Sequence, residues 1–411
     1  MAKDLLMTQI TDEEVEKMRS RIGLSNPTIR TGVVSLPWNT TATFDSIRHY
    51  AESYGDSNPL FTVLQYGSST RWRTQIAPPG FEATMGHDCT PPIDPEHHRR
   101  TKSALRGVHL FHAGNQARFY RPVVAGDELF VSKVIDDVED KTSQFARRTV
   151  RVTNENTWST TDGSIVSRWH PWYIHAERKS AGKDGKYAAD TPPSYTDDDL
   201  EEIEAAYNAE YMRGTDTLYW EDVKVGESLP KMVKGPMTVT DLINFHMGGG
   251  WYGYGNPAFR LAYENRKGLR GFYTRNDVNA WDVVQRIHWE PELARAVGVP
   301  AAYDIGPMRW TWLIHYCTNW IGDDAWLYEL RGEFRRFNYM GDTTWLTGSV
   351  TDKRHDPELG TVVDLAIEAR NQRDQINTLG TATVIIPSRA IGPIRLPTPP
   401  KRTGDPRPSS A

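Results

Sequence analysis

Cysteine is scarce in this chain. Only Cys89 and Cys317 occur among 411 residues, and they do not form a Cys-x-x-Cys pair. This excludes a disulfide framework, and free thiols in a reducing compartment are the simplest interpretation. The sequence also lacks an apolar run of about 18 residues, which a membrane-spanning helix needs. Residues Met1 to Asp12 carry acidic side chains and lack the apolar core of a secretory signal. These absences predict a cytoplasmic protein without a membrane partner.

An excess of one charge is also absent. The 48 basic and 53 acidic residues give a net charge of −5 and are spread along the chain, without a block of Lys and Arg. We therefore expect no nucleic-acid partner. The run Gly248–Gly250 lacks the Lys-Ser/Thr of a phosphate-binding loop, and no Gly-x-Ser-x-Gly of a serine hydrolase occurs. No histidine has metal spacing with a second His or Cys, so we expect no metal.

What the chain does contain is an internal repeat. The segment 334–350 resembles the segment 119–135: each has an aromatic and basic strand, a Gly-Asp turn and a second alternating strand. The turns, at Asp127 and Asp342, are about half the chain apart. In each half, expected helices such as 43–51 precede a series of strands, which indicates an α+β fold with antiparallel pairing. Two such repeats predict a double hot-dog, in which each antiparallel sheet wraps around a central helix.

The repeat divides the chain into four parts. We expect an N-terminal hot-dog repeat over residues 1–175 and a C-terminal repeat over 216–390. A linker with an acidic helix, 197–212, lies between them at 176–215, and a flexible tail covers 391–411. The acidic helix is either a solvated surface or a partner-binding face, and the first reading is favoured.

A short motif in the first half carries a family resemblance. The residues Gly55-Asp56-Ser57-Asn58-Pro59-Leu60-Phe61 resemble the Gly-Asp-x-Asn-Pro-x-His signature of MaoC-like (R)-specific enoyl-CoA hydratases, with Phe61 at the histidine position. In the second half, His288-Trp289-Glu290-Pro291 resembles the stretch that begins at the family histidine. The whole chain is similar to long MaoC-like proteins with a fatty-acid-synthase-like dehydratase N-terminal half.

The resemblance implies hydration of a trans-2-enoyl-CoA, or the reverse dehydration of a 3-hydroxyacyl-CoA. In the family an Asp and a His hold one water for general acid–base catalysis. His288 is the corresponding base here, and its acidic partner is either Asp282 or Asp304. Gly306, followed by Pro307, matches the glycine whose N–H stabilises the thioester oxygen. Coenzyme A is part of the substrate, so no separate cofactor is expected.

The remaining candidates are divided between the two halves. Tyr303, His246 and Trp289 are expected to line the substrate pocket of the second half. Asp56 and Asn58 are either catalytic or caps of the turn that contains them. With Phe61 at the histidine position and Pro79, which has no N–H, at the glycine position, the first half is expected to bind the acyl tail. His112 is expected to make a structural hydrogen bond, and His315 to be a core histidine.

Three functions remain open at this point. The first is an acyl-CoA hydratase or dehydratase that uses His288. The second is a non-catalytic or partial-site partner of another MaoC-like subunit. The third is another CoA-thioester lyase or hydrolase, because one fold can host several reactions. A homodimer or higher homo-oligomer is expected, with a second MaoC-like subunit as the alternative partner.

Overall fold

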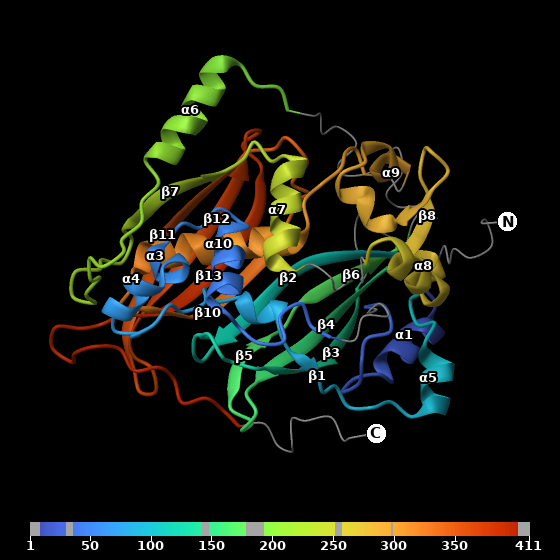
Figure 1. Cartoon of the computed structure of the whole chain (residues 1–411), viewed down its shortest axis with the longest axis horizontal. Coiled ribbons are helices and arrows are strands. Elements are labelled where there is room, and N and C mark those ends of the chain that lie inside the picture. Colours follow the sequence, from blue (N-terminus) through green and yellow to red (C-terminus); the bar gives the residue numbers. More distant parts are fainter. Residues whose placement is uncertain are drawn as a thin grey trace.

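The computed structural model describes residues 9–29, 36–141, 148–177, 193–250, 257–296 and 299–401. Its main feature is one 11-stranded sheet in the order β1-β3-β4-β5-β2-β10-β13-β12-β11-β7, in which β6 pairs with β2 and β4 (Figure 1). The first half supplies β1 (His87–Asp88), β2 (His109–Phe119), β3 (Phe130–Lys141), β4 (Thr149–Ser159), β5 (Ile165–Trp169) and β6 (Trp172–Ala176). The second half supplies β7 (Ser228–Lys234), β10 (Trp326–Phe334), β11 (Thr344–Asp356), β12 (Gly360–Asn371) and β13 (Ile376–Ile385).

Helices precede the strands in both halves. The first half contains α1 (Asp12–Arg19), α2 (Phe44–Glu52), α3 (Pro59–Thr62), α4 (Leu64–Ser69), the 3-10 turn η1 (Phe81–Thr84) and α5 (Pro95–Thr101). The helix α6 (Asp197–Asn208) lies between the halves. The second half contains α7 (Val239–Gly249), α8 (Phe259–Gly268), η3 (Arg270–Phe272), the hairpin β8 (Tyr273–Arg275) and β9 (Trp281–Val283), η4 (Val284–His288), α9 (Pro291–Ala296) and α10 (Gly306–Ile321).

The two halves join through β2 and β10. These strands pair antiparallel, from Glu329 opposite Arg118 to Glu333 opposite Gly114. A single apolar cluster runs through both halves, and Trp169 of β5 lies 5.7 Å from Trp310 of α10 between ring centroids. The continuous sheet and shared core confirm the predicted α+β double hot-dog.

The repeated Gly-Asp turns are built in the same way. Gly126 and Gly341 both have positive φ, 94° and 89°, which glycine adopts without steric cost. Each following aspartate then accepts a hydrogen bond from the backbone N–H three residues earlier, at Val124 and at Tyr339, both at 3.0 Å. The sequence repeat therefore reflects a repeated hydrogen-bonding pattern.

The central helices of the two repeats differ. In the second half, α10 has 16 residues and is buried from Met308 to Ile321, as expected of a helix that is apolar on all sides. In the first half, the described residues between Ser69 and β2 contain only the short helices η1 and α5. Pro78 and Pro79 precede η1, and Gly80 starts it in the left-handed conformation with φ of 100°. The first repeat thus wraps a much shorter turn than the second.

The helical segment of the first half packs on the second half instead (Figure 1). Tyr66 of α4 donates to Asp323 at 2.6 Å, just beyond the end of α10. Helix α2 packs on α7 so closely that a Cβ on Gly248 would lie 2.2 Å from the carbonyl oxygen of His49. This segment brings the Asp56 motif to α10.

The expected linker is only partly described. Residues 1–8, 178–192 and 402–411 lie outside the described residues. Helix α6 begins at the predicted Asp197, with a capping box formed by Thr196 and Asp199, and its acidic side chains are mostly exposed. No helix in the described part of the chain is both long and apolar enough to cross a membrane.

Candidate functional site

The structure separates the predicted residues into two groups along α10. His288, Tyr303, Asp304 and Gly306 gather at the start of this helix, and we call them, with His112 and Arg309, the helix-start site. Asp56 lies instead at the middle of α10, beside His315. Gly306 and His315 are nine positions apart, which at about 1.5 Å per residue corresponds to about 14 Å along the helix axis. The two groups therefore cannot act on one water molecule.

Gly306 occupies the first position of α10, with Pro307 directly after it. The first N–H groups of a helix have no acceptor within the helix, and the helix dipole adds partial positive charge there. The absence of a side chain matters at Gly306, because a Cβ would lie 2.8 Å from Nδ1 of His112 and 3.1 Å from the ring of Phe334. The helix start is thus packed directly against β2 of the first half.

A buried ion pair flanks this glycine. Nε of Arg309 lies 2.6 Å from Oδ2 of Asp304, and Nη1 of Arg309 donates to the carbonyl of Arg336 at 2.8 Å. Burial raises the pKa of Asp304 to about 6, although the charge of Arg309 opposes this shift. Arg309 contacts only Oδ2 of Asp304, whereas Oδ1 is buried without a hydrogen-bond partner among the described residues.

His288 lies at the end of η4 with a defined tautomer. Its Nδ1 is 2.9 Å from the carbonyl oxygen of Tyr303, and a carbonyl only accepts, so Nδ1 carries the proton and Nε2 is left as an acceptor. Burial lowers the pKa of His288 to about 4, which keeps the ring neutral at pH 7. A neutral imidazole with Nε2 available has the form that a general base requires.

The predicted pocket residues His246 and Trp289 lie near His288, whereas, among the described residues, the candidate acidic partner Asp282 makes no recorded contact with it. The rings of His246 and Trp289 are 6.4 Å apart, and His246 contributes to the lowered pKa of His288. Asp282 lies on the β8–β9 hairpin, where its carboxylate accepts from the N–H of Val283 at 2.7 Å. In the described part of the chain, the contacts recorded for His288 do not include Asp282. Asp282 as its acidic partner therefore stays a prediction.

Asp56 and Asn58 have well-defined partners elsewhere. Oδ1 of Asp56 accepts from the N–H of Asn58 at 3.0 Å, and Asn58 caps α3 by accepting from the N–H of Leu60 at 2.9 Å. These bonds match the capping interpretation of the motif. Tyr54 also donates to Asp56 at 3.4 Å.

Asp56 also takes part in a buried group of polar side chains beside the middle of α10. We call this group the mid-helix cluster, and it consists of Asp56, His315, Lys234, Glu210 and Asn319. Nε2 of His315 lies 3.6 Å from Asp56 and 3.3 Å from Glu210, and Nζ of Lys234 lies 2.9 Å from Nδ1. Burial lowers the pKa of Lys234, against the opposing charges of Glu210 and Asp56. The cluster joins four segments of the chain by buried polar contacts. His315 is thus a core histidine with polar partners.

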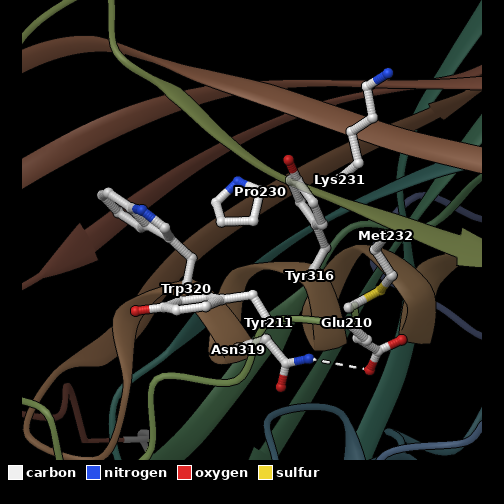
Figure 2. A pocket seen from close by; sticks show the side chains of 8 residues that line it. All are labelled: Glu210, Tyr211, Pro230, Lys231, Met232, Tyr316, Asn319 and Trp320. Atoms are coloured by element: carbon white, nitrogen blue, oxygen red, sulfur yellow. Dashed lines mark hydrogen bonds between the residues drawn. The ribbon is translucent and has the colours of Figure 1, made fainter. Parts of the chain in front are cut away.

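A small recess reaches the edge of this cluster (Figure 2). Asn319 donates to Glu210 at 3.2 Å in its wall. The recess includes about 210 Å³ of empty space, and this figure counts open solvent as well. The volume enclosed by its walls is therefore well below the roughly 300–1,000 Å³ of typical ligand pockets. Its remaining walls come from Tyr211, Pro230, Lys231, Met232, Tyr316 and Trp320. As it stands, this recess is too small for an acyl-CoA.

The sequence did not single out three residues that complete these groups. Neither Arg309 nor Lys234 stood out in the sequence as a candidate site residue. His112 was assigned a structural hydrogen bond, because nothing in its neighbourhood in the sequence connects it with Gly306. A basic residue inside an otherwise apolar helix was the one available signal, since a buried charge needs a partner.

Comparison with known proteins supports the fold and the family. The family described as FAS1-like, dehydratase domain region matches residues 30–168. A UPF0336 protein of Parafrankia sp. is 30% identical over 125 residues, covering 30% of this chain and 76% of that protein. A UPF0336 protein of Streptomyces avermitilis is 28% identical over 97 residues, covering 23% and 61% respectively.

Solved structures extend the similarity to both halves. A MaoC-like dehydratase is 17% identical with a TM-score of 0.57, covering 88% of this chain and 100% of that one. A MaoC domain dehydratase from Chloroflexus aurantiacus is 15% identical with a TM-score of 0.50, covering 88% and 96%. These likenesses show a shared fold across most of the chain. The Parafrankia relative, 76% of which this chain covers, shows that the chain belongs to the UPF0336 family, with a FAS1-like dehydratase region at residues 30–168.

Proposed function

We propose that this protein is an acyl-CoA hydratase or dehydratase that works at the helix-start site. It would add water across the C2–C3 double bond of a trans-2-enoyl-CoA, or remove water from a 3-hydroxyacyl-CoA. The observation that supports this proposal is the tautomer of His288, whose Nδ1 bond to Tyr303 leaves Nε2 as an acceptor near the start of α10.

The thioester oxygen would lie at the N–H of Gly306. Negative charge develops on this oxygen when water adds to C3, and donors fixed before the reaction stabilise that charge. The dipole of the 16-residue α10 acts in the same direction. Gly306 suits this role because a side chain there would collide with His112.

His288 would act as the base. Its Nε2 takes a proton from water as the oxygen bonds to C3, and the same proton is then available for C2, so the atoms balance without another reactant. Burial keeps His288 neutral before the reaction. Because coenzyme A is part of the substrate, the proposal needs no further cofactor. We also propose that the first half binds the acyl tail.

A second candidate is a partner subunit with an incomplete site, in complex with another MaoC-like chain. The observation that favours it is that both candidate carboxylates are already engaged, Asp304 by Arg309 and Asp56 by the mid-helix cluster. In this case the purified chain would bind a CoA thioester without turnover. Co-expression with a second MaoC-like subunit would then restore hydration. A homodimer remains the proposed state if the chain is active alone.

Loss of the enoyl thioester absorbance, followed with short, long and aryl-substituted enoyl-CoAs, tests the proposal. His288→Gln is expected to lower kcat by about 100-fold or more, the usual contribution of a general base. His170→Gln is the matched control, because the His170 side chain is partly exposed and lies beside Glu155, between β5 and β6. A wild-type protein that releases free thiol instead of hydrating indicates thioester hydrolysis. Full activity of His288→Gln would refute the role of His288.

A further inference from the structure

We propose that His112, from the first half, is a second catalytic residue of the helix-start site and accepts a hydrogen bond from the reacting water. This inference rests on the proposed hydration, and it supplies a second acceptor beside Nε2 of His288. It assigns to the first half a direct part in the chemistry.

The position of His112 is the first reason. Its ring lies against Gly306, with Nδ1 2.8 Å from the place of a Cβ on that residue. The pairing of β2 with β6 is irregular between His112 and Gly114, and such bulges redirect a side chain and are frequent beside active sites. The irregularity thus falls at the residue that faces the thioester-binding position.

The second reason is an atom without a partner. Within the described residues, Nε2 of His112 is buried and has no hydrogen bond. The backbone of Gly114 acts on the ring as an acceptor, which raises the pKa of His112 against the effect of burial. Because Nε2 has no partner, the proposal places the proton on Nδ1. His112 then has the same form as His288, with Nδ1 protonated and Nε2 left as an acceptor.

The electrostatics of His112 agree with this form. Burial and the nearby charge of Arg309 lower the pKa of His112 to about 4, so the ring is neutral at pH 7. Phe334 and Tyr173 flank the ring, with centroids at 5.1 and 5.2 Å. Their packing fixes the orientation of the ring, as a catalytic group requires.

The two histidines border one short segment of chain. His288 bonds to the carbonyl of Tyr303, and His112 touches Gly306 three residues later. A water between them would donate one O–H to each Nε2. In hydration its oxygen bonds to C3, one proton passes to a histidine and then to C2, and the second O–H remains as the product hydroxyl.

The test compares two substitutions of His112 in the full chain. His112→Phe keeps a ring but removes the acceptor, and we expect kcat for enoyl-CoA hydration to fall by about 100-fold, with KM nearly unchanged. His112→Gln keeps an acceptor near the place of Nε2, so we expect it to recover at least about tenfold of that loss. His109→Phe, three residues earlier on β2, is the control and should retain wild-type kcat. Equal damage by Phe and Gln, or none by either, overturns the proposal.

A second measurement separates this proposal from the proposed function. In ¹⁵N-histidine NMR spectra, the Nε2 signal of His112 is the one that the His112→Gln variant lacks. Addition of 3-hydroxybutanoyl-CoA to the wild-type protein should shift this signal. A wild-type protein without turnover, but with this shift, refutes the hydratase and leaves His112 as a thioester contact rather than a catalytic residue. An unmoved signal overturns the assignment of His112, whether or not the protein hydrates its substrate.

Discussion

Nε2 of His315 lies 3.6 Å from Oδ1 of Asp56, so the motif of the first half meets the central helix of the second half. Lys234 and Glu210 complete this contact. The motif of the first half is thus part of the buried polar contacts that join the two repeats.

Substitution of Asp56 should therefore affect stability more than activity. Asp56→Ala leaves Lys234 without one of its buried counter-charges and His315 without one of its polar neighbours, and removing one partner of a buried charge contact costs about 3 kcal/mol. Urea unfolding would measure the lower free energy of unfolding, with kcat per folded molecule unchanged. A folded Asp56→Ala protein that loses about 100-fold of kcat would instead place the reaction in the mid-helix cluster.

Gly306→Ala should lower activity without unfolding the protein. The new Cβ would lie 2.8 Å from His112 and 3.1 Å from Phe334, so the ring of His112 must move away from the helix start. Alanine is otherwise favoured over glycine in a helix, by about 1 kcal/mol. We expect kcat to fall by roughly tenfold or more and the melting temperature to change little. Gly268→Ala is the control, because no atom lies within 4 Å of its added Cβ. Unchanged kcat in Gly306→Ala would count against the helix-start site.

The seam between the halves should be sensitive to a single methyl group. A Cβ on Gly114 would lie 2.0 Å from the ring of Trp172 and 2.4 Å from the carbonyl oxygen of Gly332 on β10. Gly114→Ala must therefore displace the β2–β10 pairing, and overpacking of this kind costs roughly 1–3 kcal/mol. Thermal unfolding would show this as a lower Tm. The same Tm as the wild type would mean that the seam can relax.

Stability should rise with pH between about 4 and 6.5. Burial lowers the pKa of His112, His175 and His288 to about 4, whereas an unfolded histidine titrates near 6.5. Within this window the unfolded chain binds protons that the folded chain does not, so the free energy of unfolding increases with pH. Asp304, whose pKa burial raises to about 6, has the opposite sign below pH 6, because the folded chain retains its proton. Burial also raises the pKa of Glu82 and Asp323, which act in the same direction as Asp304. The positive slope is therefore the contribution of the three histidines.

Removing one of these histidines should flatten that slope. His288→Gln eliminates the uptake of up to one proton on unfolding, which is worth at most about 1.4 kcal/mol per pH unit. Urea unfolding at pH 4.5, 5.5 and 6.5 would compare the slopes of the wild type and the variant. Identical slopes would show that His288 titrates normally in the folded protein.

Local sequence determined the parts of this protein that depend on local geometry. The Gly-Asp turns required glycine at positive φ and an aspartate that bonds the backbone three residues earlier. The start of α10 at Gly306 and Pro307 and the α6 capping box followed from the same kind of rule. The α+β class and the double hot-dog could be inferred because these local patterns occur twice.

Only the tertiary structure decided which side chains meet. The position of Asp56 beside His315, rather than near His288, depends on how α2–α4 pack over the second half. The contact of His112 with Gly306 depends on the β2–β10 pairing and on the irregular backbone at His112. Contacts of this kind join residues far apart in the chain, and they are fixed by the packing of whole elements. A short sequence motif cannot reveal these long-range contacts, because each partner by itself fits an ordinary strand or helix.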